Sequence, residues 1–148
     1  MSGFTTSFLF LDINVWMALT HARHVHHVVA SDWFESLERD VRFCFCRFTQ
    51  LGLLRLLTAE AVMGDDVLHQ AEAWAVYDRW LVDARVRFLE EPPGIERRFR
   101  GLTRTKQSSP KIWADAYLAA FAEASQLTLV TFDRAFRGKA RPLMLLEE

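Results

Sequence analysis

The sequence predicts an α/β protein, a three-layer α/β/α sandwich around a mostly parallel sheet, and two adjoining stretches carry most of the evidence. Residues 112–122 are apolar almost throughout, which is typical of a helix packed on most sides. Residues 127–132, LTLVTF, have the β-branched and apolar composition of a covered parallel strand. The rest of the chain repeats this alternation, so we expect helices on both faces of the sheet.

Length and composition fit one domain over residues 1–148. Half of the chain is hydrophobic (51%) and 13% is aromatic, which excludes a disordered protein. The net charge is −1, yet residues 134–141 hold four basic side chains and no acidic one. No Lys or Arg precedes the first apolar run, and Asp12 and Asn14 interrupt it early, so we expect neither a signal peptide nor a membrane span. The sequence thus predicts a soluble, cytoplasmic protein.

The elements follow one another without a linker or an internal repeat. Apolar runs predict strands at residues 7–11, 42–48, 86–89, 127–132 and 143–146. Helical spacing predicts helices at residues 13–22, 28–39, 49–62, 67–84, 95–102 and 110–122, with a short turn at 134–136. We expect Thr49 to cap the third helix, and residues 67–84 to form the longest helix, with Ala71, Trp74, Tyr77 and Leu81 along one stripe of core or dimer contacts.

Three aspartates are predicted to meet at one edge of the sheet. Asp12 follows the first strand, Asp133 follows the strand at residues 127–132, and Asp115 lies in the first turns of the helix before that strand. Carboxyl ends of parallel strands share an edge, where α/β proteins bind ligands. Grouped carboxylates need a cation, and oxygen ligands select Mg²⁺ or Mn²⁺, which can activate water against a phosphodiester. The alternative is that the three acids are helix caps and surface charges.

Two other groups of side chains resemble metal sites less closely. Histidines stand at positions 21, 24, 26 and 27, but no third ligand for zinc is evident elsewhere, so we interpret them as solvated. Cys44 and Cys46 alternate in an apolar run and are interpreted as buried reduced thiols rather than a disulfide or a metal pair.

Basic residues flank the acidic centre, as contacts to a phosphate backbone would. Arg97, Arg98 and Arg100 lie on the helix at residues 95–102, and the loop-like stretch at 103–111 follows it. The candidates for RNA contacts are Arg104, Lys106, Lys111, Arg134 and Arg137. Motifs of the common RNA-reading modules are absent from the sequence, so the choice of RNA cannot be read from it.

Three blocks, LFLDINVWMAL, CRFTQLGLLRLLT and ADAYLAAFAEASQLTLVTFDRAF, together resemble PIN-domain proteins, specifically the VapC-like toxins of toxin–antitoxin pairs. The resemblance covers nearly the whole chain. It implies a parallel α/β/α sandwich, Mg²⁺- or Mn²⁺-dependent endoribonuclease activity, a small antitoxin partner and a homodimer. Matched motif to motif, Asp12, Asp115 and Asp133 take the places of metal-binding acids. Asn14 and Thr131 match polar positions that support these ligands by hydrogen bonds.

The chain departs from the family pattern at Gln50, where relatives often carry a glutamate. A glutamine brings no charge, so the resemblance implies a site with three carboxylates and weaker metal affinity; Glu90 or Glu91 could compensate. One alternative is a PIN scaffold that binds RNA or antitoxin without cleaving. Another is a phosphatase of the haloacid dehalogenase type with Asp12 as nucleophile, but Asn14 stands where that class has its second aspartate.

Overall fold

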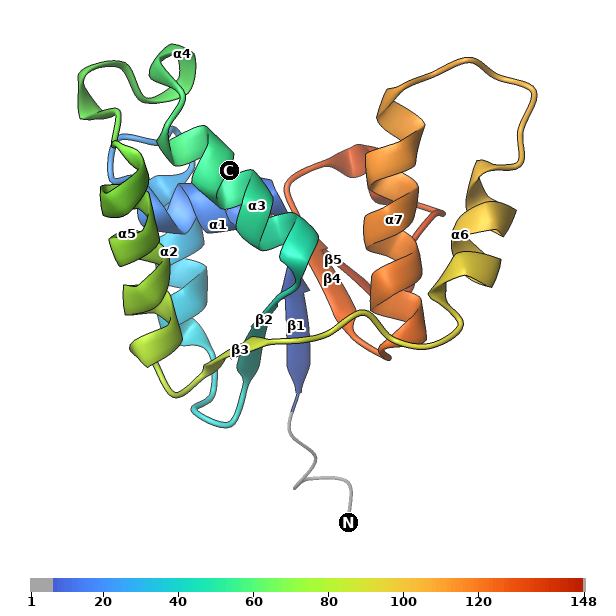
Figure 1. Cartoon of the computed structure of the whole chain (residues 1–148). Helices are drawn as coiled ribbons and strands as arrows, with labels where there is room; N and C mark the ends of the chain where they lie inside the picture. Colours follow the sequence, from blue (N-terminus) through green and yellow to red (C-terminus); the bar gives the residue numbers. More distant parts are fainter. Residues whose placement is uncertain (1–6, 148) are drawn as a thin grey trace.

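The computed structural model describes residues 7–147 and contains a five-stranded sheet in which every pair of neighbours is parallel. The order across the sheet is β3-β2-β1-β4-β5 (Figure 1). The strands are β1 (Phe8–Leu11), β2 (Arg42–Phe45), β3 (Val86–Phe88), β4 (Thr128–Thr131) and β5 (Leu143–Leu145). The predicted fold class is confirmed, and the sheet is parallel throughout rather than mostly so.

Helices cover the sheet from both sides. Those before β3 in the chain are α1 (Ile13–Thr20), α2 (His27–Ser36), α3 (Arg47–Leu57), α4 (Glu60–Met63), η2 (Gly64–Asp66) and α5 (Gln70–Val82). Those after β3 are α6 (Ile95–Thr103), α7 (Lys111–Ala124) and η3 (Arg134–Phe136). Figure 1 shows α1, α2, α3 and α5 on one side of the sheet and α6 and α7 on the other. Each right-handed crossover of a parallel sheet needs such a helix.

The two faces of the sheet bury separate cores because successive side chains of a strand point in opposite directions. In β1, Leu9 and Leu11 join the core under α1, α2, α3 and α5, whereas Phe10 joins the core under α7. Aromatic stacking fills both cores, with Trp16 on Phe45 at 3.8 Å between ring centroids on the first face. On the second face, Phe10 stacks on Phe121 of α7 at 4.8 Å.

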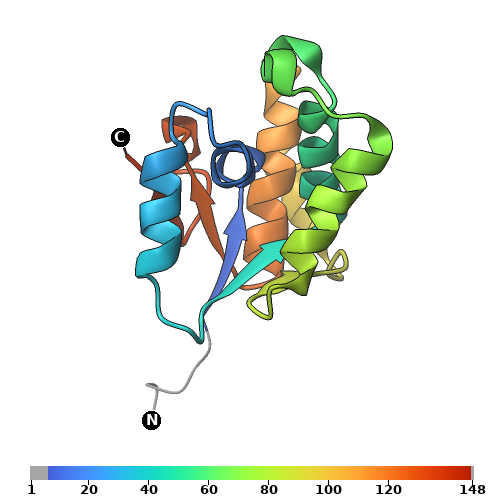
Figure 2. The same ribbon diagram turned by 90° about the vertical axis from the view of Figure 1, so that its left-hand side faces the viewer.

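The strands run toward one end of the molecule, and this end carries the polar residues that follow them. Figure 2 shows β1, β2 and β4 pointing the same way, toward the start of α1. β1 passes into α1 with Asp12 as the only residue between them, and its side chain caps the helix. Such direct strand-to-helix passages leave little room for a loop, so the residue at the junction is held firmly.

Several predicted boundaries are wrong, and local capping explains them. The second strand ends at Phe45, because the side chain of Thr49 accepts a hydrogen bond from the backbone N–H of Cys46 and α3 begins at Arg47. Cys46, not Thr49, is therefore the cap residue. The predicted helix at residues 49–62 is divided, since α3 ends at Leu57 and α4 is a separate short helix.

The prediction for the helix at residues 67–84 is also wrong in extent and in its buried stripe. A capping box between His69 and Glu72 starts α5 at Gln70, so α5 has 13 residues and α7, with 14, is the longest described helix. The buried residues of α5 are Ala73 and Tyr77, whereas Ala71 and Trp74 of the predicted stripe are exposed. Of the predicted stripe, Tyr77 is buried and Leu81 packs against the core.

Gly52 is the point where α3 approaches α1 most closely. A Cβ atom at this position would overlap Cδ1 and Cγ1 of Ile13, the first residue of α1. We expect Gly52→Ala to destabilise the protein by about 1–3 kcal/mol, as overpacking of a tight contact does, measured as a lower urea midpoint. Gly101→Ala in α6 is the matched control, because no atom lies within 4 Å of a Cβ there. Gly101→Ala should leave the urea midpoint unchanged or raise it. An unchanged midpoint for Gly52→Ala would show that α3 and α1 are not tightly packed at this position.

Candidate metal centre

Asp12 is a buried carboxylate with both oxygens engaged. Its side chain is at the junction of β1 and α1, where Oδ1 accepts a hydrogen bond of 2.7 Å from the backbone N–H of Ile13. Oδ2 accepts a hydrogen bond of 2.7 Å from the hydroxyl of Thr131 at the end of β4. Asp12 is only 8% exposed. A carboxylate this deep is tolerated because hydrogen bonds replace part of its lost hydration.

The hydroxyl group of Thr131 connects the end of β4 with the residue that follows β1. Besides donating to Asp12, its Oγ1 accepts the backbone N–H of Asp133 at 3.0 Å and faces the amide nitrogen of Asn14 at 3.4 Å. The amide oxygen of Asn14 in turn accepts the N–H of Phe132 at 3.5 Å. Asn14 and Thr131 therefore lie beside Asp12 and Asp133, at the positions where we expected side chains that support the acids by hydrogen bonds.

Asp133 and Asp115 approach the same edge from β4 and α7. Asp133 caps η3, since its Oδ1 accepts the N–H of Ala135 at 2.8 Å. The ammonium group of Lys111, the first residue of α7, lies 3.7 Å from Oδ2 of Asp133. Asp115 is one turn further along α7 and is half-buried. The three predicted aspartates therefore arrive at one edge, with Lys111 beside them.

The electrostatics link these three acids. Burial raises the pKa of Asp12 above 3.8, hydrogen bonds from Thr131 and Ile13 oppose the rise, and the charges of Asp115 and Asp133 add to it. Burial likewise raises the pKa of Asp115, with Lys111 lowering it and Asp133 raising it. Each carboxylate feels the negative charge of its neighbours, so the group as a whole favours a bound cation.

The donor set fits a hard divalent cation in its chemistry. Three carboxylates offer oxygen ligands of the kind that Mg²⁺ and Mn²⁺ prefer, and neither thiolate nor imidazole is among them. Across residues 7–147, however, no three His, Cys, Asp or Glu side chains are arranged so that they could already hold one metal ion together. The argument for a metal ion therefore depends on the oxygen ligands of the three aspartates and on the repulsion between their charges. It does not depend on a preformed coordination sphere.

Gln50 is buried in the first turn of α3, but its amide is held by neighbours on α3 and α5. Its Oε1 accepts a hydrogen bond of 2.7 Å from the guanidinium of Arg47, which also lies over the ring of Phe88. A hydrogen bond with Gln50 also lowers the pKa of Tyr77, against the larger raising effect of burial. Gln50 is thus a neutral, hydrogen-bonded residue at this position, rather than a fourth charged ligand.

Glu91 is held elsewhere by a tyrosine. The hydroxyl of Tyr117 on α7 donates a hydrogen bond of 2.7 Å to Oε2 of Glu91. Together with burial, this bond raises the pKa of Tyr117. The negative charge of Glu91 acts on Cys46, whereas the acids that act on Asp12 are the other two aspartates. The structure therefore does not bring Glu91 to the three aspartates, and Glu90 is exposed in the loop after β3.

A hollow of about 520 Å³ opens beside Asp115. Its walls come from the loop before α7, from the start of α7 and from the segment after Asp133: Gln107, Ser108, Ser109, Lys111, Ile112, Asp115, Ala135 and Lys139. Lys139 lowers the pKa of Asp115, which places its charge near the carboxylate. Lys139 lies six residues after Asp133, in the basic segment that follows this aspartate.

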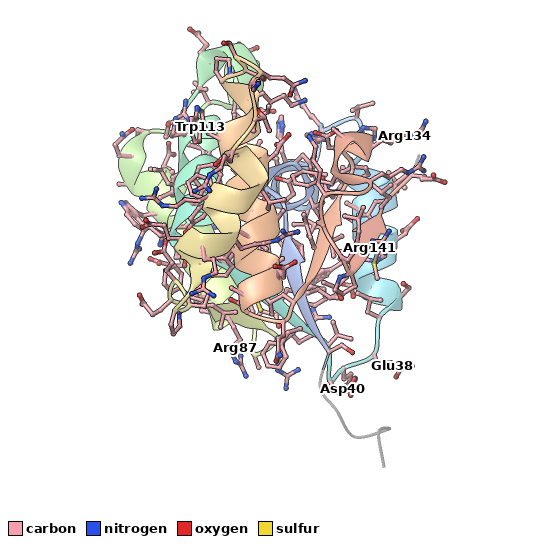
Figure 3. The ribbon with its side chains drawn as sticks, turned by 90° about the vertical axis from the view of Figure 1, so that its right-hand side faces the viewer. Glu38, Asp40, Arg87, Trp113, Arg134 and Arg141 are labelled. Atoms are coloured by element: carbon pink, nitrogen blue, oxygen red, sulfur yellow. The ribbon has the colours of Figure 1, made fainter. Side chains whose placement is uncertain are left out.

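The other basic candidates are exposed around this end of the molecule. Arg104 and Lys106 lie between α6 and α7, Arg134 is the first residue of η3, and Arg137 directly follows this element. Figure 3 shows Arg134 at the end where the helix α7 begins and Arg87 at the opposite end. The structure thus surrounds the carboxylates with cations from two segments that are distant in the sequence.

The histidines that were interpreted as solvated are only partly exposed, and they have partners within the protein. His21 Nε2 lies 3.1 Å from Asp66, His27 Nδ1 lies 2.7 Å from the carbonyl oxygen of Ala18, and the ring of His26 stacks on Phe132. Cys44 and Cys46 are buried and unpaired, as expected. Burial raises the pKa of Cys44 to about 12, so this thiol is protonated and inert at neutral pH.

Within residues 7–147, no helix has the length and apolar composition needed to cross a membrane.

Comparison with known proteins now identifies the family. The model of the PIN domain matches residues 9–142. The chain is 42% identical over 132 residues to ribonuclease VapC41 of Mycobacterium tuberculosis, covering 86% of this chain and 90% of that relative. Ribonuclease VapC29 of the same organism is 30% identical over 126 residues, covering 83% and 84%. The chain belongs to the PIN-domain family, so the resemblance predicted from its sequence blocks is confirmed. Ribonucleases of this family depend on divalent metal ions in general.

Solved structures agree on the fold. VapBC2 from Rickettsia felis, bound to a DNA fragment from its promoter, matches with a TM-score of 0.66 at 14% identity, covering 93% of this chain and 96% of that chain. VapC20 of Mycobacterium tuberculosis, a Sarcin-Ricin loop cleaving toxin, matches with a TM-score of 0.65 at 18% identity, covering 88% and 93%. Both likenesses concern the arrangement of strands and helices.

The raised pKa of Asp115 predicts how stability depends on pH and metal. An acid whose pKa is higher in the folded state than its ordinary 3.8 holds its proton more tightly when folded, so the folded state loses stability as pH rises above 3.8. Asp115→Asn should therefore raise the thermal midpoint of the metal-free protein at pH 7.5, modestly because water screens a half-exposed carboxylate. The gain should vanish near pH 3.8, where the parent carboxyl is protonated.

Added Mg²⁺ should stabilise the parent more than Asp115→Asn, because a ligand stabilises only the state that binds it. The matched control is Asp40→Asn, an exposed aspartate at the other end of the molecule (Figure 3). Equal Mg²⁺ shifts for the parent and for Asp115→Asn would show that Asp115 does not contribute to a metal site.

Proposed function

We propose that this protein is a Mg²⁺-dependent endoribonuclease, with Mn²⁺ as a possible substitute, and the toxin of a toxin–antitoxin pair. The observation that carries the proposal is the buried Asp12, fixed by Thr131, with Asp115 and Asp133 acting on it electrostatically. If Asp12 served only to cap α1, its hydrogen bond with the N–H of Ile13 would be sufficient. Three mutually repelling acids beside two lysines instead suit a cation and a phosphate.

The roles divide between ligands and supporting residues. Asp12, Asp115 and Asp133 would hold the metal ion, which, when bound, supplies an activated water and stabilises charge on a phosphodiester oxygen. Thr131 and Asn14 keep the carboxylate of Asp12 in one orientation. Lys111 and Lys139 line the hollow beside Asp115 and would bind the phosphates on either side of the scissile bond. Arg104, Lys106, Arg134 and Arg137 would extend this contact along the RNA backbone.

A second candidate function is RNA or antitoxin binding without cleavage. The observation in its favour is the neutral Gln50, whose oxygen is taken by Arg47. Such a protein would keep the basic rim and the fold but would lack the charge needed for firm metal binding. Metal-dependent cleavage separates the two candidates directly.

The proposal extends to partners, organisation and location. We propose a single PIN domain over residues 1–148 that acts in the cytoplasm, a homodimer, and inhibition by a small cognate antitoxin. Large apolar side chains on the α3–α5 side support a protein partner, since Leu51 is 53% and Val62 is 47% exposed. The structures of VapBC-1 from nontypeable Haemophilus influenzae and of FitAB bound to an IR36 DNA fragment share the fold.

Cleavage of total bacterial RNA by purified protein tests the activity. We expect cleavage with Mg²⁺ or Mn²⁺, none with EDTA, and a loss of at least about 100-fold in Asp115→Asn, since removing even an outer partner of a metal ligand costs up to about that much. Asp40→Asn should cleave like the parent. RNA that stays intact under every metal condition while still binding the protein would contradict the enzyme and support the binding module.

Gln50→Glu tests what the missing acid does. A carboxylate at this buried position would add negative charge to the metal site, so we expect the Mg²⁺ concentration for half-maximal cleavage to fall by about tenfold, or roughly 1.4 kcal/mol. Gln70→Glu, the same change at an exposed position in the first turn of α5, should leave the Mg²⁺ requirement unaltered. An unaltered requirement in Gln50→Glu would show that this side chain does not act on the metal.

A further inference from the structure

An aromatic groove between α6 and α7 lies outside the group of carboxylates. It encloses about 410 Å³ and is lined by Glu96, Phe99, Arg100, Thr103, Arg104 and Trp113. Trp113 is 58% exposed, although tryptophan is among the side chains that gain most from burial. Its ring meets that of Phe99 with 6.0 Å between centroids, so one face of the groove is aromatic.

Basic residues are frequent in the segment that contributes most of this groove, and two arginines, Arg100 and Arg104, line it. Residues 95–111 contain six basic residues and one acidic residue, although Arg98 is paired with Glu123 and Lys111 with Asp133. The acidic residue, Glu96, is already paired with the guanidinium of Arg100 at 2.8 Å. Arg104 at the end of α6 is exposed and forms no ion pair with any other residue from 7 to 147. An apolar surface framed by cations suits a ligand that is flat, aromatic and negatively charged.

We propose that this groove binds an unpaired base of the RNA substrate, with the base stacked on Trp113 and the adjoining phosphate held by Arg104. The proposal rests on the proposed ribonuclease function and names the form of RNA, single-stranded at this point, that the site takes. Every nucleobase offers a π-face, so stacking on an exposed aromatic ring, combined with arginine contacts to phosphate, binds single strands with little sequence preference. A paired base would not be free to enter.

The position of the groove connects it with the acids. Trp113 and Asp115 are both in the first half of α7, two residues and so about 3 Å apart along the helix axis. Figure 3 shows Trp113 and Arg134, the residue after Asp133, at the same end of the molecule. Side chains two residues apart point to different sides of a helix, so a strand would cross the start of α7 to place one phosphate at Asp115 and a neighbouring base on Trp113. An antitoxin side chain could also fill an apolar groove, but the basic frame favours the polyanion.

Binding of a fluorescently labelled single-stranded RNA oligonucleotide, followed by anisotropy, tests this inference. The Asp115→Asn protein is used as the background so that no RNA is consumed. We expect Trp113→Leu to weaken binding by about tenfold, as removal of one base–aromatic stack does, while Trp113→Phe keeps most of the affinity. Leucine keeps apolar bulk but has no π-face, so this pair separates stacking from simple hydrophobic contact. A labelled duplex of the same sequence should not distinguish the two variants.

Arg104 is tested by salt dependence. Arg104→Ala should lower the slope of log affinity against log salt by about one, as the loss of one phosphate contact does. Arg87→Ala removes an exposed arginine at the opposite end of the molecule and should leave the slope unchanged (Figure 3).

Equal RNA affinity for Trp113→Leu and Trp113→Phe would overturn the proposal. So would Trp113→Leu weakening self-association or antitoxin binding but not RNA binding, which would assign the groove to a protein partner. The proposed function fails on a different result, namely the absence of metal-dependent cleavage by the natural protein. The two failures are distinguishable because the anisotropy experiment measures binding without cleavage.

Discussion

The hydrogen bond between Asp12 and Thr131 joins the ends of β1 and β4, and the site depends on it. The parallel register that pairs Leu11 with Val130 sets these two residues one step beyond the ladder, and the backbone N–H of Asp12 continues the ladder to the carbonyl of Val130. Because this arrangement is fixed by the backbone, Asp12 cannot turn toward solvent without losing both of its hydrogen bonds. The fold therefore keeps a carboxylate in a position that burial alone disfavours.

The balance of charge around that carboxylate explains the arrangement of the neighbouring residues. Asp115 and Asp133 add negative charge, and Lys111 and Lys139 lower the pKa of Asp115. Lys111 contacts Asp133 and supplies part of the positive charge that balances these acids. The same ammonium group is well placed for a phosphate once a divalent cation neutralises the acids. Stability and function thus oppose each other here, as is common at sites that hold like charges together.

The sequence permitted prediction of the sheet, the ends of β1 and β4 and the convergence of the three aspartates, because these follow from local patterns. Apolar runs that stop at an acid, as at Asp12 and Asp133, locate strand ends without any knowledge of contacts. The starts of α3 and α5 could not be predicted, because they depend on capping hydrogen bonds between Cys46 and Thr49 and between His69 and Glu72. Pairs between separate elements, such as Glu91 with Tyr117, have no local signal at all.

Gln50 and Trp113 relate the proposed metal site at the three aspartates to the proposed RNA-binding groove between α6 and α7. The neutral Gln50 leaves three carboxylates, so the proposed site would have limited metal affinity of its own, and a substrate phosphate would contribute to the binding of the ion. Residues that hold the RNA then influence metal binding as well, since the two ligands stabilise one another by linkage. A stacking surface at Trp113 and a phosphate contact at Arg104 would make this contribution from outside the carboxylate group. Under the proposed function, the charge missing at Gln50 would therefore be offset where the RNA binds rather than where the metal binds.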